Sequence, residues 1–427
     1  MLILHGVNCI NAGDLGIIHA TVQRLREEMP RATVAILSPF FGFSAKYLQG
    51  YEYRREVDVE SWGATEVEDF YSIPLEGTIR KVRFFSVFAS LLVTALVDRF
   101  LFGFRLSKRH RVLKHYVAAD AIISKGGGFL HDKTGSVGIP PHLASMLLAL
   151  CYEAPLVIYA QSIGPLENTL GRFLTRFVLN HADCILIREQ KSLDFVREDL
   201  CVDNSKIDLT ADEAFLLVAA EDSRIDEILS GHGISADRPI VGFAPCNWGF
   251  PDSIDPVASK KKYVEETAIT ISSLTADFDA QCVIACHVEV DGTRDDRAIA
   301  MEVLALIEED RDVHLLGVLD DVEIKGIWSR CDLFIGTRMH SNIFALAGGV
   351  PTIAISYLHK TAGIMEDLGL SDWVVAIDEF TSERAIEMTR RILEEGALTR
   401  EIVGRRVETM KAVSRQNARK VRDLVSN

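Results

Sequence analysis

Residues 335–360, IGTRMHSNIFALAGGVPTIAISYLHK, contain the pattern that decides the fold. An apolar run at 331–336 predicts a short buried strand, and residues 341–347 then have the spacing of a helix. Two glycines and a proline end that helix before a second apolar run at 351–356. The order strand, turn, helix, strand is typical of an open α/β sheet.

The turn after the first of these strands carries Arg338 and His340. Ligands of open α/β sheets bind at the carboxyl ends of the strands, where a helix N-terminus adds N–H donors. Arginine grips a phosphate or carboxylate with two hydrogen bonds, and histidine exchanges protons near neutral pH. With Lys360 after the second strand, the segment predicts an anion site. The alternative is that Arg338 pairs with a nearby acid and His340 only caps the helix.

Apolar strands and helical patterns alternate along the rest of the chain, and the pattern restarts after a polar segment at 219–238. We therefore predict an α/β fold with two Rossmann-like domains whose parallel sheets face a cleft, since 427 residues exceed one core. The predicted domains are residues 1–218 and 219–427. Residues 400–425 have the pattern of a basic amphipathic helix that packs back across both domains.

Composition restricts the partners of the chain. With 46 basic and 61 acidic side chains, the formal charge of −15 argues against nucleic acid, so an anionic ligand needs a local basic cluster. Eight cysteines without C-x-x-C pairs fit a reducing cytoplasm. Cys282, Cys286 and His287 lie in a predicted buried strand and lack a second ligand pair, so no metal site is predicted.

An apolar stretch at 84–97 is flanked by basic residues within the segment 80–111. Its fourteen residues are fewer than the roughly twenty that a spanning helix needs. A basic-flanked apolar helix is a candidate for contact with an anionic membrane surface, and a buried core helix or lid is the alternative. The start of the sequence leads directly into a predicted strand, so no cleavable signal is expected.

Two further turns follow predicted strands of the first half. Asn11, Gly13 and Asp14 follow the first strand, and we predict that Asp14 caps a helix that begins at Leu15. This turn either contacts an acceptor substrate or only caps the helix. No G-x-G-x-x-G motif is present, which argues against a dehydrogenase.

The second turn carries Gly126, Gly127 and Gly128, with Asp132 shortly after it. Three glycines leave backbone N–H groups uncovered for an oxyanion or a sugar hydroxyl, unless they form a plain tight turn. Arg188 ends another strand of the first half. It either forms a salt bridge with Glu189 or another acid, or it clamps one end of a dianion across the cleft from Arg338.

Taken together, these motifs resemble one known family. The segments that carry the likeness are NAGD (11–14), GGGFLHD (126–132), AQSIGP (160–165), IREQKS (187–192) and GTRMHSNIFALAGGVPTIAISYLHKTAGIMEDLGL (336–370). They resemble the polysaccharide pyruvyl transferase family, whose members are similar to two-domain GT-B glycosyltransferases. The most specific part is R-x-H followed by a strand, a tyrosine and a lysine, here Arg338, His340, Tyr357 and Lys360.

The resemblance implies transfer of pyruvate from phosphoenolpyruvate to a sugar, forming a ketal with loss of phosphate. Arg338 and Arg188 would bind the two anionic groups, Lys360 would add charge as phosphate departs, and Ser341 and Tyr357 would complete the donor site. His340 would act as general acid or base. The donor is a substrate, and neither a cofactor nor a metal is implied.

The implied acceptor is a polysaccharide or lipid-linked glycan, reached in the cytoplasm or at the cytoplasmic face of the membrane. Two alternatives stay open. A GT-B glycosyltransferase would use a nucleotide sugar, with Asp14 or Asp132 as base, and a non-catalytic glycan-binding protein would only retain the scaffold.

Overall fold

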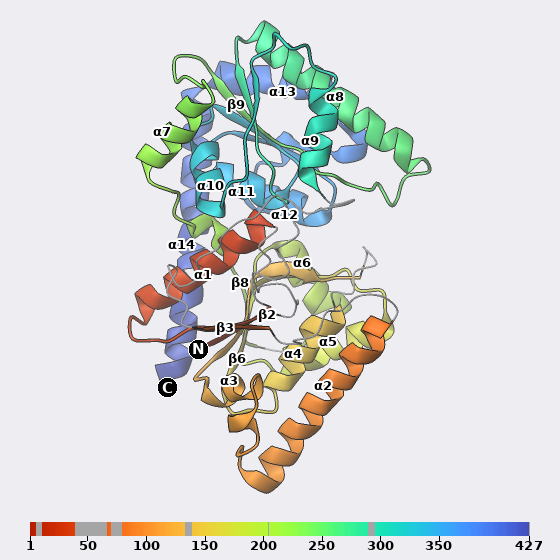
Figure 1. Cartoon of the computed structure of the whole chain (residues 1–427), viewed down its shortest axis with the longest axis vertical. Coiled ribbons are helices and arrows are strands. Elements are labelled where there is room, and N and C mark those ends of the chain that lie inside the picture. Colours follow the sequence, from red (N-terminus) through yellow and green to blue (C-terminus); the bar gives the residue numbers. More distant parts are fainter. Residues whose placement is uncertain are drawn as a thin grey trace.

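The computed structural model of the chain contains two parallel sheets, one in each half, with helices packed around them (Figure 1). It describes residues 1–5, 11–38, 66–69, 79–132, 139–203, 205–288 and 295–426, with backbone alone for 38, 66–69, 79–84, 139–141 and 359. The predicted α/β class with two Rossmann-like sheets is confirmed.

The N-terminal sheet has the strand order β3-β2-β1-β4-β6-β7-β8, and β5 pairs with β6. Its pairings are parallel. From β1 the next strands, β2 and β3, are added on one side, whereas β4 and the later strands are added on the other side. This switch point between β1 and β4 leaves a crevice at their carboxyl ends. The strands are β1 (Leu2–Leu4), β2 (Ala35–Ser38), β3 (Glu66–Asp69), β4 (Ile122–Ser124), β5 (Gly127–Leu130), β6 (Leu156–Ile163), β7 (Cys184–Ile187) and β8 (Ile207–Leu209).

The C-terminal sheet is also parallel and has the order β11-β10-β9-β12-β13-β14. The switch point in its strand order lies between β9 and β12. The turn after β12, which carries Arg338 and His340, therefore lies at the crevice of this second sheet. The strands are β9 (Ile240–Ala244), β10 (Gln281–Ile284), β11 (Val313–Leu315), β12 (Leu333–Gly336), β13 (Thr352–Ser356) and β14 (Val374–Ala376).

Central strands are visible in the sequence because both of their faces are covered. β6 and β9 are buried at every position, and such strands read as continuous apolar runs. The sequence does not predict β3, β8 and β14, which lie at sheet edges. β3 has the sequence EVED and β8 has IDL, so charged residues interrupt the apolar signal there.

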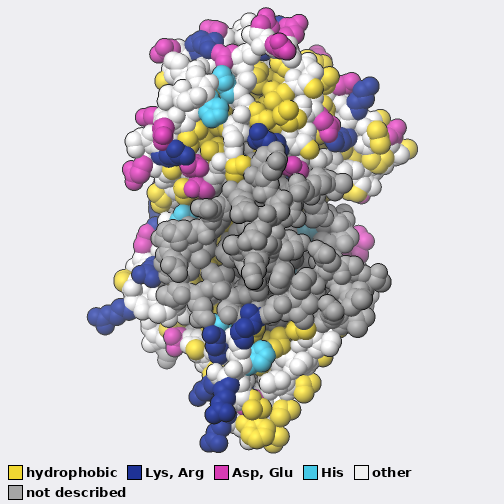
Figure 2. All heavy atoms as spheres, in the orientation of Figure 1, with side chains coloured by type: hydrophobic (Ala, Val, Ile, Leu, Met, Phe, Trp, Pro, Cys, Tyr) yellow, Lys and Arg dark blue, Asp and Glu magenta, His cyan; other side chains and the backbone are white. Residues whose placement is uncertain are grey.

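The helices of the N-terminal half cover both faces of its sheet (Figure 1). Hydrophobic and basic side chains gather at the end of this half that is farthest from the other half (Figure 2). The helices are α1 (Ala12–Glu28), α2 (Ile79–Val97), α3 (Leu113–Ala118), α4 (Ile139–Ala149), α5 (Thr169–His181) and α6 (Gln190–Asp194), with short helical turns at Asp98–Phe102, Ser107–Arg109, Phe195–Asp199 and Glu213–Leu216.

In the second half, the polar segment at 219–238 contains a helix, α7 (Asp222–Gly231), which the sequence analysis did not predict. Its Ile225, Ile228 and Leu229 are buried, so it packs on the C-terminal half. The boundary at 218/219 stays a prediction. The other helices are α8 (Pro256–Asp277), α9 (Asp296–Leu304), α10 (Asp321–Ser329), α11 (Met339–Ala347), α12 (His359–Asp367), α13 (Ser382–Glu395) and α14 (Ala397–Ser426), with short turns at Ser371–Trp373 and Ile377–Glu379.

The last helix, α14, joins the two halves (Figure 1). Val403 and Val407 are buried in the C-terminal core, whereas Ala418 and Val421 are buried against the N-terminal sheet. Between them, Ser414 Oγ and Asn417 Nδ2 each donate to the buried Glu213 carboxylate at 2.9 Å. The helix therefore fixes how the two crevices face each other.

Candidate active site

The predicted site residues come from turns at the carboxyl ends of strands in both sheets. The N-terminal half supplies the turns after β1, β4 and β7, and the C-terminal half supplies those after β12 and β13. Residue Ala12 N donates to His287 O at 2.9 Å, so the first turn of α1 is bonded directly to the C-terminal half. The two crevices are therefore parts of one interdomain site.

Arg188 lies at the predicted place, but its side chain is fully buried and already paired. Nη1 donates to Asp212 Oδ2 at 2.5 Å. Nε donates to Ser162 Oγ at 2.7 Å and lies 3.3 Å from Glu189 Oε2. Nη2 lies 3.9 Å from the sulfur of Met339 on α11 of the other half. The predicted salt-bridge alternative thus describes two edges of this guanidinium, and the third contacts Met339.

Arg338 is also paired with an acid. Nε and Nη2 donate to the two oxygens of Asp296 at 3.0 and 2.7 Å. Asp296 is fully buried and also accepts from the backbone N–H of Asn247 and Val288. This bidentate pair fixes the guanidinium, which remains 20% exposed at the N-terminus of α11.

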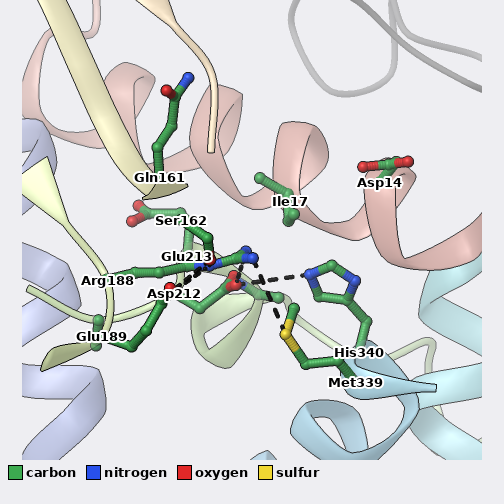
Figure 3. Close-up of polar contacts among 12 residues, drawn as sticks. Asp14, Ile17, Gln161, Ser162, Arg188, Glu189, Asp212, Glu213, Met339 and His340 are labelled. Carbon is green, nitrogen blue, oxygen red and sulfur yellow. Dashed lines mark hydrogen bonds and ion pairs between the residues drawn. The ribbon is translucent and has the colours of Figure 1, made fainter. Parts of the chain in front are cut away.

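His340 contacts the same carboxylate that holds Arg188. Its Nε2 lies 3.5 Å from Asp212 Oδ2, and Asp212 lies between the arginine and the imidazole (Figure 3). Burial lowers the pKa of His340, although Asp212 acts in the opposite direction. Burial opposes ionisation of Asp212, but Arg188 and His340 hold the pKa of this carboxyl well below its usual range. The site thus has a neutral histidine beside a fixed negative charge, which suits proton transfer.

Gly13 permits the close approach of α1 to α11. A Cβ atom on Gly13 would lie 2.4 Å from His340 Nδ1, and one on Gly16 would lie 2.6 Å from Phe344 Cζ. Any larger residue would displace the histidine. The group that lies against the Gly13 backbone is His340 of the other half.

The cap of α1 differs from the prediction. The helix begins at Ala12, and its N-cap is Asn11, whose Oδ1 accepts from Gly13 N at 3.0 Å. Asp14 was predicted to be the cap, but it lies in the first turn and accepts from Lys125 Nζ at 3.2 Å. Partial burial opposes ionisation of Asp14, yet Lys125, His340 and Lys360 together lower its pKa. Asparagine outcompetes aspartate here because it directly precedes the helix.

The glycine turn after β4 makes room for two cations. A Cβ atom on Gly128 would lie 3.3 Å from Arg188 Nη2 and 3.5 Å from Lys360 Nζ. Gly127 has φ +150°, and a Cβ on Gly126 would lie 3.0 Å from the carbonyl of Ala160. The backbone of Gly128 thus separates the arginine of one half from the lysine of the other.

A small pocket opens at this point between the two halves. Its lining residues are Gly128, His131, Ser162, Gly164, Pro165, Leu358 and Lys360. Burial and the nearby Arg188 lower the pKa of Lys360 to about 8. Within the described ranges, the Lys360 ammonium has no hydrogen bond or ion pair to the protein. It is therefore available to an anion.

The helices that follow β12 and β13 both begin without a side-chain cap from any described residue. Arg338 is the N-cap of α11 and Leu358 that of α12. Uncapped helix N-termini keep N–H donors and a partial positive charge available to an anion. Both lie at the C-terminal side of the cleft, next to Arg338 and Lys360.

Three predicted residues have other contacts. Asp132 accepts from the backbone N–H of Glu167 and Asn168 at 2.6 and 2.8 Å, so it fixes the loop before α5. Ser341 is buried and donates to the carbonyl of Arg338 at 2.5 Å. Tyr357 packs on Trp248 with ring centroids 4.5 Å apart. Burial raises the pKa of its hydroxyl, and the nearby Arg338 acts in the opposite direction. Of the three, Tyr357 bears directly on a cationic site residue.

Three residues of the site were not predicted from the sequence: the acids Asp212 and Asp296, which orient its arginines, and the buried Lys125. Asp212 follows β8, an edge strand that the sequence did not reveal. Asp296 is the first residue of α9 and pairs with an arginine 42 positions away. Lys125 directly precedes the glycine turn, and that position was the available signal. In the described part of the chain, no three His, Cys, Asp or Glu side chains converge as metal ligands would.

Comparison with known proteins identifies relatives of the chain. A family model described as polysaccharide pyruvyl transferase matches residues 11–359. Amylovoran biosynthesis protein AmsJ of Erwinia amylovora is 23% identical over 412 residues, which cover 96% of this chain and 95% of that protein.

Solved structures of similar fold come from GT-B enzymes. UDP-GlcNAc 2-epimerase from Neisseria meningitidis, bound to UDP-GlcNAc, has a TM-score of 0.62 at 11% identity, over 100% of this chain and 99% of that one. Anabaena HepE in complex with UDP and glucose has a TM-score of 0.57 at 14% identity, over 100% and 98%. At these identities the likeness shows the GT-B fold alone, and it confirms that predicted architecture.

Proposed function

The chain belongs to the polysaccharide pyruvyl transferase family, and we propose that it transfers pyruvate from phosphoenolpyruvate to a sugar of a polysaccharide or lipid-linked precursor. The product is a ketal across two hydroxyls, and phosphate is released. The observation that carries the donor assignment is Lys360, a pocket-lining ammonium without an ion pair to any described residue.

Phosphoenolpyruvate has two anionic groups a few bonds apart, and the cleft offers two cationic places. One is formed by Lys360 Nζ and by Nη2 of the buried Arg188, which lie 3.5 and 3.3 Å from the position that a Cβ on Gly128 would take. The other is the exposed part of Arg338 at the uncapped start of α11. We assign phosphate to the first place and carboxylate to the second, because a lysine can follow the charge of departing phosphate.

Asp212 and Asp296 have a positioning role in this proposal. Each carboxylate fixes the orientation of one guanidinium, Asp212 that of Arg188 and Asp296 that of Arg338. A pre-oriented guanidinium loses little freedom on binding, which favours a small ligand with few contacts.

His340 acts as the acid–base group. One acceptor hydroxyl attacks C2 of phosphoenolpyruvate while C3 takes a proton, and the C2–O bond to phosphate breaks as the second hydroxyl attacks C2. Of the two protons that the hydroxyls lose, one ends on C3 and one leaves with phosphate. Neutral His340 takes a hydroxyl proton and returns it to C3, and the Asp212 carboxylate stabilises the imidazolium in between.

The acceptor is proposed from the family and from AmsJ, whose name places it in amylovoran biosynthesis. Its side of the cleft is the N-terminal half, where Asp14 and Lys125 form a polar pair at the start of α1. A glycosyltransferase function is supported by the fold alone. The structural neighbours that bind UDP or UDP-GlcNAc are only 11–14% identical to this chain, so they show a similar fold and no more. The family match favours pyruvyl transfer.

Ligand-dependent stabilisation tests the donor. Thermal unfolding is measured with phosphoenolpyruvate, with UDP-GlcNAc and with inorganic phosphate. A ligand that binds the folded state adds about 2.7 kcal/mol at one hundred times its Kd. We expect phosphoenolpyruvate to stabilise the wild type. At the same ligand concentration Lys360→Gln should lose about half of that effect, whereas Lys261→Gln, on the exposed side of α8, should retain it. Stabilisation by UDP-GlcNAc and not by phosphoenolpyruvate would establish the glycosyltransferase alternative.

A further inference from the structure

The turn after α2 exposes large apolar side chains at the far end of the N-terminal half. We call Phe100, Leu101, Phe102 and Leu106 the α2 tip. Phe100 is 77% exposed and Leu101 is 71% exposed, and the tip forms part of the apolar surface at the lower end of Figure 2. Contiguous exposed apolar groups of this size mark an interaction surface.

The geometry of the tip is fixed by a buried carboxylate. Asp98 is fully buried and accepts from the backbone N–H of Leu106 at 3.0 Å and of Ser107 at 2.5 Å. Gly103 has φ +56°, a conformation that glycine adopts readily, and it closes the turn. The apolar groups are therefore held outward by the fold.

The apolar surface continues along one side of α2. Phe85, Val93, Leu96 and Val97 are exposed, whereas Leu91 and Ala95 on the other side are buried in the N-terminal core. By length and composition alone, Phe85–Phe102 could cross a membrane, and 17% of this stretch is buried. Because one side packs on the domain, the helix is suited to lying along a surface.

Cations surround the tip. Arg99, Arg105, Lys108, Arg109 and Arg111 are all exposed. Between residues 79 and 119 the sequence has nine lysines or arginines and one acid, Asp98, which is turned inward, although the whole chain has a formal charge of −15. Dark blue side chains adjoin the apolar surface at the lower end of Figure 2.

We propose that the α2 tip docks on an anionic lipid bilayer, with its apolar residues in the headgroup region and the basic residues on the lipid phosphates. This combination is the one that interfacial helices use. A second copy of the chain fits the tip poorly, because a symmetric contact would place the same cations opposite one another. Docking would hold the enzyme at the membrane that carries lipid-linked acceptors, and this consequence alone rests on the proposed function.

Vesicle co-sedimentation of the full chain tests the proposal. We expect binding to vesicles of phosphatidylcholine with phosphatidylglycerol, and at least tenfold weaker binding to phosphatidylcholine alone or at high salt. Arg105→Glu with Arg109→Glu, and separately Phe100→Ser with Leu101→Ser, should each reduce binding more than tenfold. The matched control, Ile254→Ser with Val257→Ser, changes exposed apolar residues of the C-terminal half and should bind like the wild type.

Other outcomes overturn the proposal. Equal binding of the tip variants and the control would exclude the tip as the docking surface. Concentration-dependent dimers that the tip substitutions abolish, without vesicle binding, would assign the surface to a second copy. Retention in cell membranes after carbonate extraction would show a spanning helix. Phosphoenolpyruvate binding, measured on the same variants, separates these failures from a failure of the proposed function.

Discussion

Cations gather in two regions of this molecule, the cleft and the α2 tip, and the two regions differ in how these cations are buried and paired with acids. In the cleft, Arg188 and Arg338 are matched by the buried acids Asp212 and Asp296, and Lys360 is left without an ion pair to a described residue. At the α2 tip, the basic residues are exposed and the one nearby acid, Asp98, bonds to the backbone instead.

The difference reflects the anion that each region would meet. A small dianion needs donors that are fixed at defined places, so each guanidinium is oriented by a carboxylate. The same carboxylate offsets the free-energy cost of burying the positive charge. A lipid surface is a diffuse anion, and exposed cations beside apolar groups suit it. Buried cations paired with carboxylates therefore indicate a site for one small molecule, and exposed cations beside apolar groups indicate a site for an extended one.

The largest expected effect concerns the cleft. His340→Ala should reduce phosphate release from phosphoenolpyruvate in the presence of acceptor by about 10²–10⁴-fold, the usual contribution of a general acid–base group. Thermal unfolding of the variant should stay close to that of the wild type. His232→Ala, at the exposed C-cap of α7, is the matched control. Full activity of His340→Ala would remove the histidine from the mechanism.

Asp212→Asn should break the pairing that distinguishes the cleft. The variant leaves Arg188 with one carboxylate fewer and His340 without its charged partner, so unfolding free energy should fall by about 3 kcal/mol. Phosphate release should fall by roughly 10²-fold, with a larger change in kcat than in KM, because the imidazolium is no longer stabilised. Urea unfolding and steady-state kinetics measure the two effects. A change in stability without one in kcat would limit Asp212 to holding Arg188.

Lys360 is the cation of the cleft that has no ion pair to a described residue, so its charge should act mainly on the ligand. Its pKa of about 8 means that its charge is lost as pH rises through 8, so kcat/KM for phosphoenolpyruvate should decline above that pH. Lys360→Gln should weaken phosphoenolpyruvate binding about tenfold at pH 7, a loss of roughly 1.4 kcal/mol. Lys360→Arg keeps its charge and should flatten the alkaline limb. An unchanged limb in that variant would assign it to another group.

The smallest expected effect comes from the tip. Arg105→Glu with Arg109→Glu should leave the Kd for phosphoenolpyruvate within about twofold, because exposed charges outside the cleft are screened beyond roughly 10 Å at ordinary ionic strength. Isothermal titration measures it. A larger change in Kd would mean that the charges of the tip influence binding in the cleft, and would contradict the separate roles assigned to the two regions.

The sequence predicted the parts of this molecule that depend on local patterns. Strands β9 and β12 are continuous apolar runs and β6 begins as one, and Arg338, His340 and Lys360 follow strands, so the fold and the position of the candidate site could be inferred. Which acids pair with which cations could not be inferred from the sequence. Asp212 and Asp296 reach the arginines from distant segments, and only the folded chain brings them together. The same holds for α1, where the space left by Gly13 is filled by His340 of the other half.

The most direct test of the proposed activity follows the product. The purified chain is incubated with ¹³C-labelled phosphoenolpyruvate and the lipid-linked glycan pool of a strain that lacks the gene, and the pool is then analysed by mass spectrometry and NMR. We predict that the label appears as a ketal carbon on a sugar, with one phosphate released per ketal, and that His340→Ala forms none. Transfer of a sugar from a nucleotide donor to the same pool, without incorporation of label, would contradict pyruvyl transfer.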